Sequence, residues 1–205
     1  MTQLDEPARL GRKRDHTRDP EILDAALDVL AETGYDGMTV DMVAARAKAG
    51  KATLYRRWPS KAELVIDAVA CMKQNDLDAA SLPDTGTLRG DLLAMIKPPS
   101  IQDGERKLRV MAGIASMVSR SPELAETARA AIVEPRIAVN RLFMERARRR
   151  GEIAEDADIE LAATIAPAMV AYRVLMLGTP ATRESMIALI DGVILPAVGI
   201  RRPRD

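Results

Sequence analysis

The spacing of apolar residues constrains the fold of this chain more than any other feature of its sequence. Apolar side chains recur every three or four positions along nearly the whole chain, and no stretch alternates β-branched with polar residues as a strand would. This spacing gathers the apolar side chains on one face of each successive helix. The pattern therefore predicts an all-α fold, in which a small amino-terminal unit precedes a larger helical bundle.

Short helices are expected in the amino-terminal part. Asp19 is positioned to cap a first helix, and Thr39 to cap a short second one. The turn 48–50 then separates the second helix from a third, which begins at Lys51 and is stopped by Pro59. Two short helices joined by a three-residue turn form a helix-turn-helix.

The next helix defines the expected domain boundary. Ser60 and Glu63 have the spacing of a capping box, which predicts a helix from Ser60 to about Leu77. The stretch "DAASLPDTGTLRG" then reads as a connection. We expect a basic arm over residues 1–18, a helix-turn-helix domain over 19–66 and a helical domain over 67–205.

Breaker residues divide the remainder of the chain. Pro135 and Gly151 are expected to end helices, as are "KPPS", "SRSP" and "LGTP". These breaks predict helices near residues 86–96, 104–119, 122–132, 135–150, 158–177 and 182–198.

Positive charge is concentrated around "KAGKATLYRRWPSKAEL", residues 48–64. The whole chain has 30 basic and 30 acidic residues, yet residues 46–61 contain no acid. The cations in this stretch are Arg46, Lys48, Lys51, Arg56, Arg57 and Lys61. Such a cluster is suited to the phosphates of a nucleic acid.

The third helix has a predicted inner and outer face. If Leu54 and Trp58 point inward, the 100° step of a helix turns other side chains outward. The outward set is Lys51, Ala52, Tyr55 and Arg56, with Thr53 at the margin. A short helix with such a face fits the major groove of DNA.

These residues resemble a known family. The stretch "ILDAALDVLAETGYDGMTVDMVAARAKAGKATLYRRWPSKAELV" is similar to the DNA-binding domain of TetR-family (TetR/AcrR-like) transcriptional regulators, over about residues 19–70. The resemblance implies base contacts from Lys51, Ala52 and Thr53. It implies contacts to the DNA backbone from Thr39, Tyr55, Arg56 and Lys61.

Two positions depart from the family pattern. Lys48 stands where members usually have glycine, and Gly50 where they usually have serine. The turn therefore lacks both a residue that tolerates positive φ and a capping hydroxyl.

The arm before the first helix is also basic. Arg9, Arg12, Lys13, Arg14 and Arg18 accompany a single acid between them, Asp15. Arg12 and Arg14 are candidates for the adjacent minor groove, and a solvated tail is the equally weighted alternative.

The larger domain is expected to bind a small molecule and to dimerise. The resemblance implies a ligand pocket in this domain. Apolar side chains on faces that look into the bundle predict a mainly apolar effector, and the candidate site comprises Met111, Met117, Phe143, Met144, Met169, Tyr172 and Arg173. Arg173 would anchor an acidic or carbonyl group, unless it serves the dimer seam. A homodimer is expected through the last two long helices, with Leu161, Ile165, Met169 and Met176 on one and Met186, Ile187, Ile190 and Ile194 on the other.

Other chemistry has little support in the sequence. His16, the only histidine, has no ligand or triad partner at suitable spacing, so we expect neither a metal nor a cofactor. The apolar stretch 161–178 is interrupted by Pro167 and Arg173, which argues against a membrane span. The amino terminus lacks the apolar run of a secretory signal, so the cytoplasm is expected.

The sequence thus predicts a dimeric DNA-binding regulator rather than an enzyme, with double-stranded operator DNA and a small effector as its partners. A repressor released by its effector is the main hypothesis. A helical-bundle enzyme or carrier with a vestigial helix-turn-helix is one alternative, and a DNA-binding protein without an effector is another. The choice between repressor and activator stays open.

Overall fold

The computed structural model describes residues 18–74, 82–96 and 101–200. These residues form helices and no strand, which confirms the all-α prediction. No described helix is long and apolar enough to cross a membrane.

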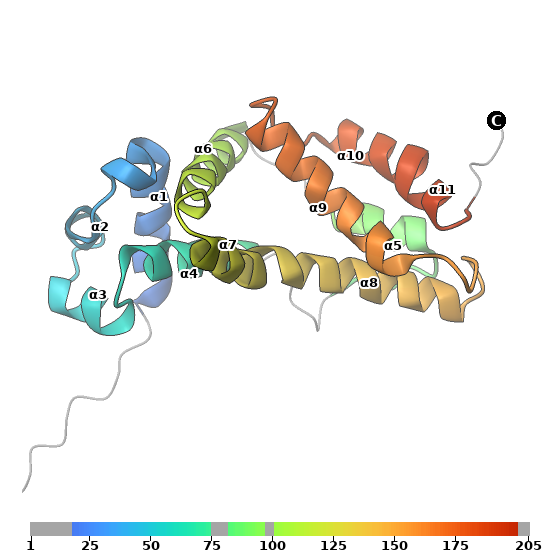
Figure 1. Cartoon of the computed structure of the whole chain (residues 1–205), viewed down its shortest axis with the longest axis horizontal. Coiled ribbons are helices and arrows are strands. Elements are labelled where there is room, and N and C mark those ends of the chain that lie inside the picture. The colour runs from blue at the N-terminus through green and yellow to red at the C-terminus, as the bar shows by residue number, and fades with distance from the viewer. Residues whose placement is uncertain (1–17, 75–81, 97–100, 201–205) are drawn as a thin grey trace, which may run out of the picture.

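The first four helices lie together at one end of the molecule (Figure 1). Their bounds are Asp19–Gly37 (α1), Val40–Arg46 (α2), Lys51–Arg57 (α3) and Lys61–Gln74 (α4). The prediction that Asp19 caps α1 is wrong, because Arg18 takes that position without a side-chain hydrogen bond. Asp19 instead forms an ion pair with Arg57 at the end of α3.

Two predicted caps are confirmed. The Thr39 side chain accepts a hydrogen bond from the backbone N–H of Met42, at 3.2 Å. The Ser60 hydroxyl accepts from the N–H of Glu63 at 3.1 Å and donates to its carboxylate at 2.9 Å. The expected end of α4 near Leu77 lies outside the described residues.

The remaining elements match the predicted helices to within a few residues at most ends. The helices are Leu88–Ala94 (α5), Ile101–Val118 (α6), Pro122–Ala128 (α7), Glu134–Arg149 (α8), Ile159–Leu175 (α9), Arg183–Leu189 (α10) and Leu195–Ala197 (α11). Two π-helical turns join neighbours among them: Arg129–Val133 (η2) and Ile190–Ile194 (η3).

The break predicted at Pro135 is wrong. Helix α7, η2 and α8 form one continuous rod, along the lower edge of Figure 1. The turn before the proline is wide, with the N–H of Glu134 bonded to the carbonyl of Arg129, five residues back. A proline ring clashes with the carbonyl four residues before it, and a π-helical turn relieves such a clash without ending the helix.

Two core clusters fill the molecule. The first is formed by α1–α4 together with α6 and the start of the rod, from which it takes Val110, Ile114, Met117, Ala128 and Ile132. The second lies among α5, α8, α9 and the carboxy-terminal elements, with Phe143, Ala163 and Val198 fully buried. The first core thus extends beyond the predicted domain boundary at residues 66–67, which stays a prediction.

Helix α6 packs closely against α1. A Cβ added to Gly113 would lie 2.7 Å from Leu30 Cδ1, so a larger residue at this position would require the buried Leu30 side chain to shift. Ion pairs flank the contact, joining Arg106 to Asp24 and Asp28, and Arg120 to Asp36.

Helix α9 contains a proline in its interior. Pro167 has no N–H, so the carbonyl of Ala163, four residues earlier, lacks its usual helical partner. The buried side chain of Asn140, on α8, donates to this carbonyl at 2.9 Å. Asn140 therefore satisfies a buried group that the proline would otherwise leave unpaired.

We predict that Asn140→Leu lowers the free energy of unfolding by about 1–3 kcal/mol, because the Ala163 carbonyl is left buried and unpaired. In a Pro167→Ala background the restored N–H can bond that carbonyl, so the same substitution should cost less. Urea unfolding of the four proteins at one concentration measures both costs. Equal costs in the two backgrounds would contradict this role of Asn140.

Candidate nucleic-acid interface

Helix α3 has one buried and one exposed face. Leu54 is fully buried and Trp58 nearly so, whereas 51% of Tyr55 is exposed. Lys51, Ala52 and Arg56 are exposed and Thr53 is half-buried. The outward orientation expected from the helical spacing is therefore present.

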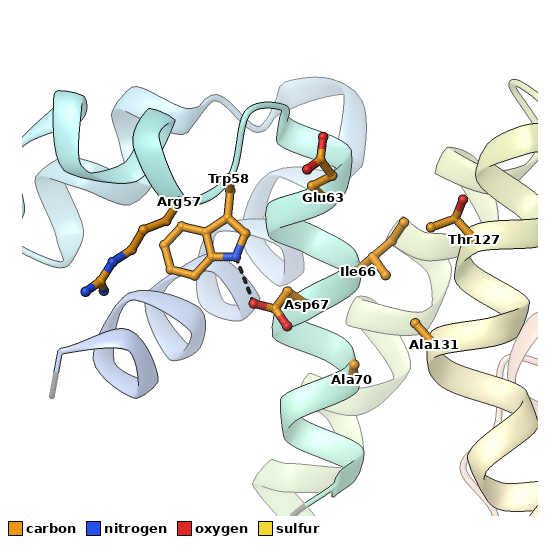
Figure 2. Close-up of a pocket in the computed structure, with 8 residues that line it drawn as sticks. All are labelled: Arg57, Trp58, Glu63, Ile66, Asp67, Ala70, Thr127 and Ala131. Carbon is orange, nitrogen blue, oxygen red and sulfur yellow. Dashed lines mark hydrogen bonds between the residues drawn. The ribbon is translucent and has the colours of Figure 1, made fainter. Parts of the chain in front are cut away.

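The end of α3 is fixed from two sides. The indole N–H of Trp58 donates to a carboxylate oxygen of Asp67 on α4, at 2.8 Å, the contact dashed in Figure 2. On the other side, Arg57 pairs with Asp19 at the start of α1. These contacts hold the exposed face of α3 in a fixed direction.

An open pocket lies beside the Trp58 contact. It has a volume of about 300 Å³ and lies between α4 and the start of the α7–α8 rod (Figure 2). Ile66 and Ala70 line it from α4, facing Thr127 and Ala131. The packing of the rod against α4 is therefore incomplete on this side.

Thr39 and Lys61 occupy the ends of neighbouring helices. Thr39 is exposed at the start of α2. The Lys61 ammonium donates to the carbonyls of Tyr35 and Met38 at 2.7 and 3.0 Å, and lies 4.3 Å from the centre of the Tyr35 ring. Burial raises the pKa of Tyr35. Lys61 thus ties α4 to the end of α1 with two of its three N–H groups.

The turn between α2 and α3 keeps a left-handed residue without glycine. Lys48 has φ 48° and is the one non-glycine residue of positive φ in the described parts of the chain. Such a conformation costs about 1–2 kcal/mol. Arg18 donates to the neighbouring carbonyl of Ala47 at 2.9 Å. At the cap of α3, Gly50 is extended and provides no side-chain hydrogen bond.

Acids from outside the basic stretch neutralise part of it. Lys51 lies 2.5 Å from the carboxylate of Asp41 on α2, and Arg46 forms two hydrogen bonds with Glu32 on α1. Hydrogen bonding from Arg46 lowers the pKa of Glu32. The sequence gives no sign of these two ion pairs, because each joins residues on different helices, which come together only in the folded structure.

Of the cations in the basic arm, only Arg18 lies within the described residues. Arg12 and Arg14 lie outside the described residues. Arg18, at the end of the arm, is exposed and bonds to the turn.

The predicted effector residues lie in three different settings. Met117 is buried in the first core, with Met111 packed against it, while Phe143 and Met144 are buried in the second core. Met169 and Tyr172 are on an exposed face of α9, 39% and 51% accessible. Arg173 has a buried Nε without a hydrogen-bond partner in the described structure. The pocket stays a prediction.

The residues predicted for the dimer seam divide as well. On α9, Leu161, Met169 and Met176 are exposed, whereas Ile165 packs against the second core. The prediction is wrong for Ile190 and Ile194, which are 2% and 1% exposed. Both lie in the second core of their own chain, because η3 packs on α5 and α9.

Comparisons with known proteins agree with this geometry. Residues 22–68 match "Bacterial regulatory proteins, tetR family", and residues 82–193 match "Tetracyclin repressor-like, C-terminal domain". An uncharacterised HTH-type transcriptional regulator of Mycobacterium tuberculosis is 38% identical over 181 residues, 88% of each chain. A DNA-binding transcriptional repressor TetR of Mycobacteroides abscessus is 33% identical over 89% of this chain and 94% of its own.

Solved structures share the fold. Salmonella enterica GusR has a TM-score of 0.69 at 21% identity, over 89% of this chain and 95% of its own. Bacillus subtilis FadR, solved in complex with stearoyl-CoA, has a TM-score of 0.61 at 19% identity, over 87% and 97%. With both parts of the chain matched and close relatives that are regulators, this protein belongs to the TetR family of transcriptional regulators.

Proposed function

We propose that this regulator is a repressor that binds operator DNA through the exposed face of α3. The observation that carries the proposal is the division of α3 into a buried face and a face of cationic, small and aromatic side chains. A helix fixed at its end by Trp58 and Arg57 enters the major groove without having to be ordered first.

The side chains divide into two roles. Lys51, Ala52 and Thr53, at the start of α3, meet base edges. Tyr55 and Arg56 contact phosphates, joined by Thr39 at the start of α2 and by the remaining N–H of Lys61. Arg12 and Arg14 in the arm add contacts in the adjacent minor groove. Phosphate contacts set affinity and base contacts set sequence preference.

We predict that Arg56→Ala weakens binding to all duplexes alike. The slope of log K against log salt should become shallower by about 1 for each protomer bound, because one phosphate contact is lost. The probe is the duplex that the wild-type protein selects from a randomised pool.

Arg149→Ala is the matched control, since Arg149 is an exposed arginine at the far end of α8 (Figure 1). It should leave the slope unchanged. An unchanged slope for folded Arg56→Ala would remove Arg56 from the interface. Failure of the wild-type protein to select any duplex would contradict the proposed function as a whole.

A second copy of the chain is the proposed occupant of an exposed apolar surface on α9 and η3. This surface comprises Leu161, Met169, Tyr172, Leu175, Met176 and Val193, each between 39% and 75% exposed. Leu161, Tyr172 and Leu175 follow helical spacing along one face of α9. An apolar surface of this length marks an interface, and two-fold pairing of α9 and the α10–α11 segment closes it as a four-helix seam.

Tyr172→Glu is expected to weaken the dimer at least about tenfold, because a charge enters the seam, while the fold persists since Tyr172 is already exposed. Met42→Glu is the control, as Met42 is an exposed apolar residue on α2. Sedimentation equilibrium measures both proteins. Equal dissociation constants for Tyr172→Glu and wild type would rule out this seam.

We further propose that the regulator is released from DNA by a mainly apolar small molecule with an acidic or carbonyl group. Arg173 supports this, because its Nε is buried with no hydrogen-bond partner among the described residues, and its Nη2 lies 3.5 Å from the Pro180 carbonyl, a long contact. A neighbour of the same fold, FadR, was solved with stearoyl-CoA. Unless Arg173 serves the dimer seam, it is the anchor.

Titration of the protein–DNA complex with straight-chain carboxylic acids should lower DNA affinity about 5- to 150-fold, the usual range of allosteric coupling. Arg173→Ala should abolish this response, whereas Arg149→Ala should retain it. A response that survives Arg173→Ala would rule out Arg173 as the anchor.

A further inference from the structure

An acid stands beside the residue expected to read bases. Asp41 lies in the first turn of α2, two residues after Thr39, and its carboxylate is 2.5 Å from the Lys51 ammonium at the start of α3. Both side chains are more than half exposed, at 53% and 62%. The pair therefore joins the two helices of the helix-turn-helix at its solvent face.

A carboxylate at this position opposes DNA binding in general. Phosphates repel it, and an exposed ion pair contributes little to folding stability. The nearby exposed side chains on α3 are cationic or neutral, with Arg56 one turn further along. The first turn of a helix favours an acid, and at this place the same acid can also accept a hydrogen bond from a base.

The pair has the chemistry of a base pair that presents an acceptor directly beside a donor. In the major groove, G·C presents guanine O6 beside the N4 amino group of cytosine, and T·A presents thymine O4 beside the N6 amino group of adenine in the same order. C·G and A·T present the reverse order. Guanine O6 and cytosine N4 are themselves hydrogen-bonded, so they lie about 2.9 Å apart. This spacing is close to the 2.5 Å between Lys51 Nζ and Asp41 Oδ2.

We propose that Asp41 and Lys51 act together as the reader of the orientation of one base pair in each half-site, G·C or T·A as against C·G or A·T, with Lys51 donating to guanine O6 or thymine O4 and Asp41 accepting from cytosine N4 or adenine N6. This inference rests on the proposed function and names part of the DNA sequence that the protein recognises.

The two charges favour each other's entry into the groove. Paired in advance, the flexible lysine side chain loses less rotamer freedom when it binds. Neither charge is left alone when water is displaced, since each keeps the other as a partner. Asp41 also directs Lys51 toward a base edge, because a phosphate close enough to bond the ammonium would approach the carboxylate as well.

The test compares wild type, Asp41→Ala, Lys51→Ala and the double variant by selection from a randomised duplex pool. Affinities are then measured on the duplex selected by wild type and on versions in which each base pair in turn is reversed, so that G·C becomes C·G and T·A becomes A·T. For wild type, one reversal per half-site should lower affinity about 5- to 150-fold, and this loss should depend on Asp41.

Asp41→Ala should lose that discrimination at the one position while binding an unrelated duplex more tightly, because a repelling charge is removed. In the Lys51→Ala background, removing Asp41 should change discrimination no further. Glu32→Ala is the matched control: it also removes an acid paired with a cation in this domain, but away from α3, and should leave every base preference intact.

Two results would overturn the inference while leaving the proposed function in place. One is an Asp41→Ala protein that selects the same base at every position as wild type does. The other is a set of reversed duplexes on which the loss of affinity is the same with and without Asp41 at every position. A wild-type protein that selects no sequence would instead overturn the proposed function, and the inference with it.

Discussion

The packing of α6 against α1 is the contact on which both halves of the molecule depend. Leu30 fits over Gly113, and Arg106 on α6 and Arg120 just after it pair with acids along α1. Through this contact Val110, Ile114 and Met117 complete the core beneath the helix-turn-helix. The small amino-terminal helices therefore share their apolar core with α6 of the larger domain.

The orientation of α3 depends on this shared core and on contacts at the ends of the helix. Its buried face is short, with Leu54 as the fully buried side chain, so it relies on contacts at its ends. Trp58 reaches α4, Arg57 reaches α1, and Arg18 holds the turn that Lys48 strains. Two of these contacts involve the start of α1, through Asp19 and Arg18, and the third involves α4.

The features that the sequence predicted best are those set by residues within one helical turn of each other. The caps at Thr39 and Ser60 are hydrogen bonds to backbone three positions away, and the faces of α3 follow from helical spacing alone. Two predictions were wrong because helical spacing and residue type alone did not determine the outcome. Pro135 breaks an isolated α-helix but not one that widens into a π-helical turn, and apolar spacing at Ile190 does not say whether its own chain or a partner covers it.

In the candidate site, too, contacts between different helices could not be predicted from the sequence. The outward set on α3 was predictable, whereas the position of Asp41 beside Lys51 depends on the angle between two helices. Residue type favours the effector residues, but it does not reveal that Met117 and Phe143 belong to separate cores. The charge of Arg173 favours an anchor, whereas only the structure shows that its Nε has no hydrogen-bond partner among the described residues.

The wide turn before Pro135 changes the phase of a helix that serves both cores. Ala128 and Ile132 belong to the first core, whereas Val139 and Phe143 belong to the second. Each residue of an α-helix advances about 100° around the axis, so a turn that holds an extra residue offsets the side chains after it from those before it. The rod therefore meets the two cores on differently oriented faces, and one uninterrupted run of helix joins them.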